Sequence, residues 1–373
     1  MNKKKILFVM DGMKLGGVER ALISVFHNVD FDKCDCDLLL LHDDDDLLSE
    51  VDIRVDTIRL SKADTIKKPF SFFFYYLLFK INTGKRKEKF AIKMQNACLR
   101  SYGRQLLGKY DVVIAYKHGE AENFVADCIK SKKKVLFYHH GSLIDEKLHK
   151  RVIEKFTKVV AVSEGVKGLL LNAYPNIKEK TLVIPNFFDR DYLLERSKEY
   201  SVAKKDKLTL CTVGRLSAEK GYFRAVESAK ILKGRGIDFS WYFIGEGDLL
   251  EDVREKVNSN GLTENVIITG GLANPLPYVS ASDVYVSASD VESFGLSMVE
   301  ALALGKPVVS TKTVGGEMLN KITQGIFLTD FTAESVAEGI INVSKTAVKV
   351  NCTEFDKEDK KIKELWKEIL SEK

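Results

Sequence analysis

Residues 281–311 read ASDVYVSASDVESFGLSMVEALALGKPVVST and contain one complete structural unit. The alternating, β-rich run Asp283–Ser287 predicts a short strand. A polar loop over 289–295 ends in glycine, and apolar residues at helical spacing over Leu296–Leu304 predict a helix. The glycine and proline that follow are typical stop signals. Because Val308 opens a second apolar run, we expect a strand–loop–helix–strand unit of a parallel sheet.

The loop of this unit combines a carboxylate with backbone amides. Glu292 lies in the loop, and the amides of Phe294, Gly295 and Leu296 lie at the start of the predicted helix. A helix N-terminus binds anions because its first N–H groups lack partners and the helix dipole favours negative charge. Glu300 falls one turn into the helix. The pattern favours a site for the hydroxyls of a phosphorylated sugar. Two solvated surface glutamates are the alternative, since Glu is a common residue.

The frame around the two glutamates is distinctive. Glu292-Ser-Phe-Gly-Leu is followed by Glu300-Ala-Leu-Ala-Leu-Gly-Lys-Pro-Val-Val, with seven residues between the glutamates. This frame resembles the donor-site motif of the family 4 retaining glycosyltransferases. The resemblance implies an α/β protein of the GT-B fold, with two Rossmann-like domains and a cleft between them. It also implies a nucleotide-diphosphate sugar as donor.

Length and composition agree with two soluble domains. The chain has 373 residues, of which 45% are hydrophobic and 30% are charged, so two cores are expected. Six scattered cysteines form no disulfide or zinc pattern, which indicates a reducing cytosol. The apolar run Ile6–Met10 is too short for a signal peptide, and no run is long enough to span a bilayer. We therefore expect a cytoplasmic protein, with the inner face of the cell membrane as a second possibility.

The N-terminal segment predicts the first unit of a doubly wound sheet. A buried-type strand over Lys5–Met10 is followed by a glycine-bearing loop and a helix over Val18–Phe26. Gly16 and Gly17 do not follow the G-x-G-x-x-G pattern, which argues against NAD. They indicate either close approach to a phosphate or sugar, or a tight turn. Gly16-Gly17-Val-Glu-Arg resembles the glycine pair that faces the donor in the family.

A basic and aromatic segment follows. Residues 62–109 hold twelve Lys or Arg against two acids, a net charge of +10, although the whole chain carries only +5. Pro69–Phe79 reads PFSFFFYYLLF. Residues 67–89 suit the interface of a membrane whose anionic head groups attract lysine. A core helix beside a solvated basic loop is the alternative. No motif that reads nucleic acid accompanies the charge.

Histidines follow two of the predicted strands. His139 and His140 come directly after the strand Lys134–Tyr138, where open α/β sheets bind ligands. A structural histidine is the alternative. The family places one histidine here that approaches the donor sugar. Both residues fit, and His140, before Gly141, is more similar to the pattern. His118 follows another strand and is a second candidate, near the acceptor.

The second domain begins with the strand Leu208–Val213 and the sequence Gly-Arg215-Leu-Ser-Ala-Glu-Lys220-Gly. Arg215 presents a planar fork and Lys220 a point charge, and both suit a diphosphate. A surface loop is the alternative, but the order of residues resembles the diphosphate clamp of the family. Gly245 lies in the next loop, which resembles a nucleotide-side loop. Asn274 departs from the commonest form of the segment beneath the base, so the base stays open.

The domain boundaries are predicted from charge and periodicity. A highly charged stretch separates an N-terminal acceptor-binding domain over 1–190 from a nucleotide-sugar-binding domain over 191–355. Residues 356–373 form an amphipathic helix that contains Trp366. In the family this helix crosses back to the N-terminal domain. An end-capping helix of the second domain is the alternative.

These features predict a retaining hexosyltransferase that needs neither a metal nor a cofactor. Arg215, Lys220 and the helix N-terminus at Gly295 would neutralise the leaving diphosphate, a role that a metal fills elsewhere. The resemblance assigns ribose hydroxyls to Glu300 and sugar hydroxyls to Glu292. The acids of 43–46 are expected in a solvated loop.

The donor is expected to be a UDP-sugar, with a GDP-sugar as the alternative. The acceptor is expected to be a glycan or lipid-linked saccharide of a bacterial surface polysaccharide. A GT-B sugar-nucleotide epimerase and a non-catalytic binding subunit are the rival functions.

Overall fold

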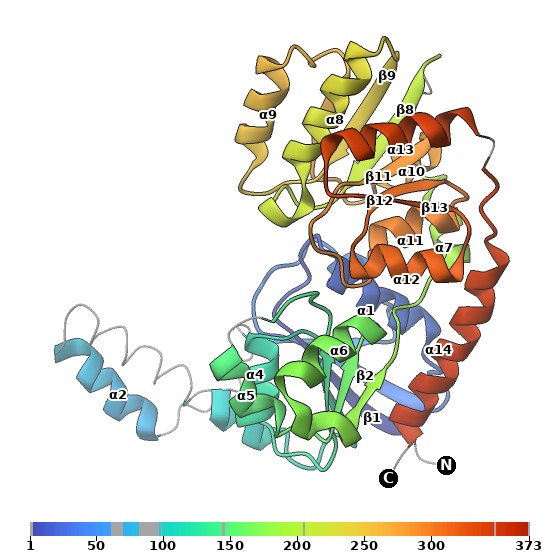
Figure 1. The fold of residues 1–373 in the computed structure, drawn as a ribbon. Coiled ribbons are helices and arrows are strands. Elements are labelled where there is room, and N and C mark those ends of the chain that lie inside the picture. The colour runs from blue at the N-terminus through green and yellow to red at the C-terminus, as the bar shows by residue number, and fades with distance from the viewer. Residues whose placement is uncertain are drawn as a thin grey trace.

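In the computed structural model, two α/β domains, each with a sheet of parallel strands, lie one above the other (Figure 1). The structure describes residues 3–60, 70–81, 97, 99–143, 146–203, 206–346 and 348–371. Each domain has one parallel sheet with helices packed against it, so the predicted α/β class and the two Rossmann-like domains are confirmed.

The N-terminal domain contains a seven-stranded sheet in the order β3-β2-β1-β4-β5-β6-β7. Its central strands are apolar because helices cover both faces of the sheet, and all four residues of β4 are buried. The strands are β1 (Lys4–Met10), β2 (Cys34–Leu40), β3 (Asp56–Arg59), β4 (Val112–Ala115), β5 (Lys134–Tyr138), β6 (Lys158–Ala161) and β7 (Thr181–Val183). The helices are α1 (Gly17–Asn28), η1 (Leu48–Glu50), α2 (Phe70–Ile81), α4 (Glu120–Asp127), α5 (Glu146–Ile153), α6 (Glu164–Ala173) and η2 (Pro175–Lys180).

The C-terminal domain contains a six-stranded sheet in the order β10-β9-β8-β11-β12-β13. The strands are β8 (Leu208–Val213), β9 (Phe239–Ile244), β10 (Val266–Gly270), β11 (Val284–Ser287), β12 (Val308–Thr311) and β13 (Ile326–Thr329). The helices are α7 (Arg190–Arg196), η3 (Ala218–Lys220), α8 (Tyr222–Gly234), α9 (Leu250–Ser259), α10 (Leu276–Ala281), α11 (Leu296–Ala303), α12 (Val314–Ile322) and α13 (Ala333–Lys345). The stretch 281–311 forms β11, a loop, α11 and β12, as predicted.

The strand order reverses once in each sheet. The reversal lies between β1 and β4 in the N-terminal sheet and between β8 and β11 in the C-terminal sheet. Ligands of open α/β sheets bind outside the carboxyl ends of the strands at such a reversal. The loops after β1, β4, β8 and β11 are therefore the places to look for a site.

The last helix, α14 (Thr353–Ser371), packs on the N-terminal domain. Figure 1 shows it descending beside both domains toward the N-terminus. Trp366 is 5% exposed, and its ring stacks on Phe137 with centroids 4.8 Å apart. Near the start of the helix, Phe355 stacks on Phe188 of the connection between the domains. The helix thereby ties the end of the chain to the first sheet.

The aromatic helix α2 exposes several large side chains. Phe74, Leu77 and Ile81 are 57%, 63% and 72% exposed, and the helix lies apart from both sheets (Figure 1). These exposures disfavour the core-helix alternative. Of the predicted basic flanking residues, Lys80 lies in the last turn of this helix, and the others lie outside the described residues: Lys67, Lys68, Lys85, Arg86, Lys87 and Lys89. No helix in the described part of the chain is both long and apolar enough to cross a membrane.

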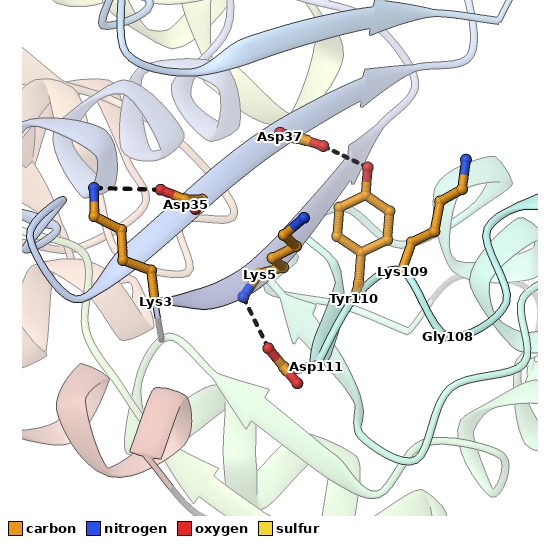
Figure 2. A pocket seen from close by; sticks show the side chains of 8 residues that line it. All are labelled: Lys3, Lys5, Asp35, Asp37, Gly108, Lys109, Tyr110 and Asp111. Atoms are coloured by element: carbon orange, nitrogen blue, oxygen red, sulfur yellow. Dashed lines mark hydrogen bonds and ion pairs between the residues drawn. The ribbon is translucent and has the colours of Figure 1, made fainter. Parts of the chain in front are cut away.

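A hollow of about 1000 Å³ lies at the amino ends of β1 and β2 (Figure 2). Lys3 Nζ lies 3.4 Å from Asp35 Oδ1, and the backbone amide of Lys5 donates to Asp111 at 2.9 Å. Tyr110 also donates to Asp37. Because ligands of this fold class bind at the opposite edge of the sheet, we assign this hollow no role in the site.

Replacing Trp366 with alanine should destabilise the protein strongly. Removing a buried tryptophan typically costs about 3–5 kcal/mol of unfolding free energy, through lost burial and the cavity that remains. The free energy of unfolding from urea denaturation measures this effect. Lys367→Ala, an exposed neighbour on the same helix, is the control and should stay within about 0.5 kcal/mol of the wild type. Equal stability of the two variants would contradict the packing of α14 on the first sheet.

Candidate active site

Loops from the two domains meet at the facing carboxyl edges of the sheets. The Ser293 hydroxyl, from the loop before α11, donates to the His139 carbonyl at the end of β5. The Ser163 hydroxyl of the N-terminal domain donates in turn to the Ser293 carbonyl at 3.1 Å. A Cβ atom on Gly17 would lie 3.3 Å from Leu296 Cδ1. These contacts bring the predicted donor loop against the predicted histidine and glycine loops.

Two residues predicted separately form an ion pair. Lys220 Nζ lies 2.6 Å from Glu292 Oε1, and Ser289 Oγ donates to the same oxygen at 3.0 Å. The side chains are 26% and 11% exposed, so the pair is partly withdrawn from water. Charge-assisted hydrogen bonds of this length are among the stronger ones in proteins. The pair places one positive and one negative group side by side at the mouth of the loop.

Arg215 lies two residues after β8, in the same loop as Lys220. Its side chain is exposed to solvent. The neighbouring loop packs closely here, since a Cβ on Gly245 would collide with the Gly214 carbonyl oxygen. Gly245 also has a φ of 154°, which side chains rarely adopt. The glycine therefore lets the loops after β8 and β9 lie in direct contact.

The N-terminus of α11 faces the cleft. Gly295 has a φ of 78° and precedes the first helical residue, with no side-chain cap. Side chains rarely adopt this φ, so the sharp entry into the helix favours glycine, while the end of the Met298 side chain packs against the same position. Phe294 is buried and anchors the turn. The first amides of the helix, at Leu296 and Ser297, precede any intrahelical acceptor and suit an anion.

Glu300 lies within α11 and is only 8% exposed. Burial raises the pKa of its carboxyl, and the charge of Arg20 acts in the opposite direction. Gly315, Gly316 and Glu317 lie in the first turns of α12, where Thr313 caps the helix by accepting from the Gly316 amide. This helix touches the site, since the Gly315 amide donates to the Glu292 carbonyl at 2.8 Å.

The two adjacent histidines have different surroundings. His139 is 7% exposed, and its ring lies against Tyr116 and Phe137. Burial lowers its pKa to about 3. His140 is half-buried, and its Nδ1 lies 2.9 Å from Ser142 Oγ, which orients the ring. A Cβ on Gly141 would lie 2.9 Å from Val291 Cγ1 of the donor loop. His140 is thus held at the cleft while His139 is packed behind it.

A charged cluster beside the glycine loop was not predicted. Lys117 Nζ, just after β4, lies 3.0 Å from Glu19 and 3.9 Å from Asp11. Burial raises the pKa of Asp11. His118 follows, and its pKa is lowered to about 4 by burial and then by the charge of His140. The sequence could have indicated this cluster, because its polar residues come directly after β1 and β4, where the strand order reverses.

In the described ranges, no group of three or more His, Cys, Asp or Glu side chains is arranged to hold a metal ion. The acids at 43–46 are mostly exposed or paired, with Asp45 at 2.7 Å from Arg59.

The two facing Rossmann-like domains define a protein of the GT-B fold, and comparison with solved structures agrees. Over its whole length the chain resembles HepE of Anabaena, solved in complex with UDP and glucose, with a TM-score of 0.75. That likeness has 20% sequence identity and covers 99% of this chain and 100% of the other. Residues 195–361, which include Arg215, Lys220, Glu292 and Glu300, match the family described as glycosyl transferases group 1. The matched residues make up a little less than half of the chain and contain most of the C-terminal domain.

Several curated relatives are named as glycosyltransferases. An uncharacterized glycosyltransferase of Methanocaldococcus jannaschii is 26% identical over 240 residues, which cover 63% of this chain and 51% of the relative. A Campylobacter jejuni protein is 24% identical over 208 residues, 56% of each chain. It is named as an N-acetylgalactosaminyltransferase acting on a saccharide-diphospho-undecaprenol. The chain matches roughly half the length of the first curated relatives.

The buried His139 should make the protein sensitive to acid. An unfolded histidine has a pKa near 6.5, whereas the folded pKa is about 3, so the unfolded state binds the proton more tightly. Stability is therefore lost as pH falls below 6.5. One such proton costs about 2 kcal/mol between pH 6.5 and 5.

The free energies of unfolding at pH 7.5 and pH 5 measure this loss. His139→Gln should lose less stability between the two than the wild type does. His42→Gln, which removes an exposed histidine, is the control and should follow the wild type. An unchanged difference in His139→Gln would show that this ring does not titrate as its burial requires.

Proposed function

We propose that the protein is a retaining, metal-independent hexosyltransferase that moves a sugar from a nucleotide-diphosphate donor to a glycan or lipid-linked acceptor. One arrangement carries the proposal. The Lys220–Glu292 pair and the open N-terminus of α11 face the His140 loop of the other domain across the cleft. A cation, an anion site and hydroxyl-binding carboxylates in one place match the parts of a sugar nucleotide.

The cationic groups act on the leaving group. Arg215, Lys220 and the amides beyond Gly295 neutralise the diphosphate as the sugar–phosphate bond breaks. Such preorganised donors stabilise charge where it develops and do not reorganise during the reaction. Lys220 meets the phosphates while it is held by Glu292, so its amine has a fixed position before the donor arrives.

The remaining groups hold the sugar and the nucleoside. Glu292 accepts from sugar hydroxyls, and Glu300 accepts from ribose hydroxyls. His140 acts on the sugar from the N-terminal domain, and the buried His139 supports its loop. Gly16 and Gly17 allow close approach of the backbone to the donor. The transition state is oxocarbenium-like, and the acceptor enters on the face that the nucleotide leaves.

The donor base and the acceptor rest on weaker support. UDP is favoured because the structurally similar HepE was solved with UDP and glucose. A GDP-sugar is the alternative. A lipid-linked acceptor of a bacterial surface polysaccharide is favoured by the name of the Campylobacter jejuni relative and by the basic segment 62–109.

Two rival functions keep the nucleotide site. A sugar-nucleotide epimerase would convert the donor without any acceptor, so conversion of a UDP-sugar by the protein alone would identify it. A non-catalytic binding subunit would bind the nucleotide but never turn the donor over. The half-buried Lys220–Glu292 pair favours a working site over a decayed one, because burying two charges is costly unless both are well placed.

One nucleoside diphosphate should stabilise the protein with or without EDTA. A ligand at one hundred times its dissociation constant adds about 2.7 kcal/mol to the stability of the folded state. Thermal unfolding with UDP, GDP, ADP or CMP measures this, and UDP is expected to give the largest shift. Arg215→Ala should lose most of it, whereas Arg254→Ala, an exposed arginine of α9, is the control and should keep it. A thermal shift that requires metal, or no thermal shift with any nucleotide, would contradict the role of Arg215 and Lys220 at the diphosphate.

Turnover of a UDP-sugar should be lost in Glu292→Ala, because this carboxylate is proposed to hold the sugar hydroxyls. Turnover that survives the substitution would contradict this role.

The helix α2 should bind anionic membranes. Its exposed aromatic and aliphatic side chains suit an interface, and each nearby lysine adds about 1 kcal/mol at an anionic surface. Co-sedimentation with vesicles that contain phosphatidylglycerol measures binding, and vesicles of phosphatidylcholine alone are expected to bind less.

The double variant Phe74→Asp, Leu77→Asp should abolish this binding. Ile53→Asp, which changes an isolated side chain that is 98% exposed, is the matched control and should leave it intact. Equal binding by both variants, or none by the wild type, would remove α2 as a membrane contact.

A further inference from the structure

Arg20 connects the N-terminal domain to the nucleotide side of the other domain. It lies on α1, three residues after Gly17, and its side chain is half-buried. Its Nη2 donates to the carbonyl of Ala273, 253 residues further along the chain, at 2.5 Å. Ala273 belongs to the segment between β10 and α10, at the carboxyl edge of the second sheet. One guanidinium therefore spans the cleft beside the proposed nucleotide site.

The segment that Arg20 contacts is fixed from behind. Asn274 Nδ2 donates to the Arg196 carbonyl at 2.8 Å, and Tyr200 Oη donates to the Asn274 carbonyl at 2.5 Å. Both partners lie in or just after α7, at the start of the second domain. The backbone of the segment is thus held on one side by its own domain and on the other by Arg20.

Arg20 also acts on Glu300. This carboxyl is 8% exposed, and burial raises its pKa. The charge of Arg20 lowers that pKa, while the charge of Glu50 in η1 raises it. Burial, and then the charge of Glu300, raise the pKa of the Cys211 thiol in β8. Glu50 is itself held by Arg196 at 3.1 Å and by the Tyr192 hydroxyl at 2.8 Å. Its charge is therefore already shared with α7, whereas Arg20, the cation that lowers the pKa of Glu300, belongs to the opposite domain.

We propose that Arg20 is a positioning residue that completes the nucleotide site across the cleft. Through the Ala273 carbonyl it fixes the segment between β10 and α10, and through its charge it keeps Glu300 able to accept from the ribose hydroxyls. Nucleotide binding and closure of the two domains are coupled through this one side chain. The inference rests on the proposed function, because it assigns Glu300 to a nucleoside diphosphate.

Binding of UDP to the full-length protein, measured by calorimetry between pH 5 and pH 8.5, tests the coupling. Arg20→Met keeps the length of the side chain and removes both its charge and its donors. UDP affinity should fall about tenfold at pH 7.5, the loss expected for one hydrogen bond to a charged group. Because the ionised carboxylate of Glu300 is the stronger acceptor, and its pKa rises further without a neighbouring cation, binding by Arg20→Met should weaken at a higher pH than in the wild type.

Arg20→Lys separates the two effects. Lysine keeps a charge near Glu300 but lacks the planar fork, so the pH at which binding weakens should stay near the wild-type value while some affinity is lost. Arg235→Met removes an arginine that pairs with Glu338 at the far end of α8, and it should bind UDP as the wild type does. Thermal unfolding of each variant without ligand shows that it is folded.

The outcomes are distinct. If Arg20→Met binds UDP with unchanged affinity and an unchanged pH profile, the inference is overturned while the proposed function stands. If its affinity falls but the pH profile does not move, Arg20 does not act on Glu300 and the inference is again overturned. If the wild type binds no nucleoside diphosphate, the proposed function itself fails.

Discussion

The hydrogen bond from the Ser293 hydroxyl to the His139 carbonyl is the contact on which the site depends. Each of these loops follows a buried strand near the reversal of its sheet. The Ser163 hydroxyl on the Ser293 carbonyl adds a second hydrogen bond between the same two domains. The close approach of Gly17 to Leu296 lies across the same boundary.

Charge in the cleft is arranged in layers. Lys220 and Glu292 neutralise each other at the mouth, while Glu300 lies deeper with its pKa raised by burial. A buried carboxylate is costly unless cations or donors surround it. In this structure the balancing cation comes from the other domain, so the deeper layer is complete only when the domains meet. The shallow layer is complete within the C-terminal domain alone.

The sequence predicted what depends on short-range patterns. The strand–loop–helix–strand unit at 281–311 has its helix, Leu296–Ala303, within one residue of expectation, because stop signals and apolar spacing act locally. Arg215, Lys220, Glu292 and Glu300 were found through their resemblance to a known motif. The ion pair between Lys220 and Glu292 was not predicted, because the two residues are 72 positions apart and come together only when strands β8 and β11 pack side by side. The contact of Arg20 with Ala273 spans even more of the chain, and no local pattern encodes it.

The connection between the domains decides how the cleft can open. Phe188 lies next to Asp189, and its ring meets both Phe355 of α14 and Phe294 of the donor loop, with centroids 4.7 and 6.0 Å away. Asp359 of α14 accepts from the amides of Phe188 and Asp189, which fastens the helix to the same point. Separating these aromatic rings would expose apolar surface, whereas parting the serine contacts exposes only groups that water can satisfy. We therefore expect the domains to rotate about the region of Phe188, so that the His139 loop and the donor loop move apart while the aromatic contacts persist. On such a path Arg20 leaves Ala273 at the same time as the site opens, and the nucleotide side loses its fixed segment and its balancing charge together.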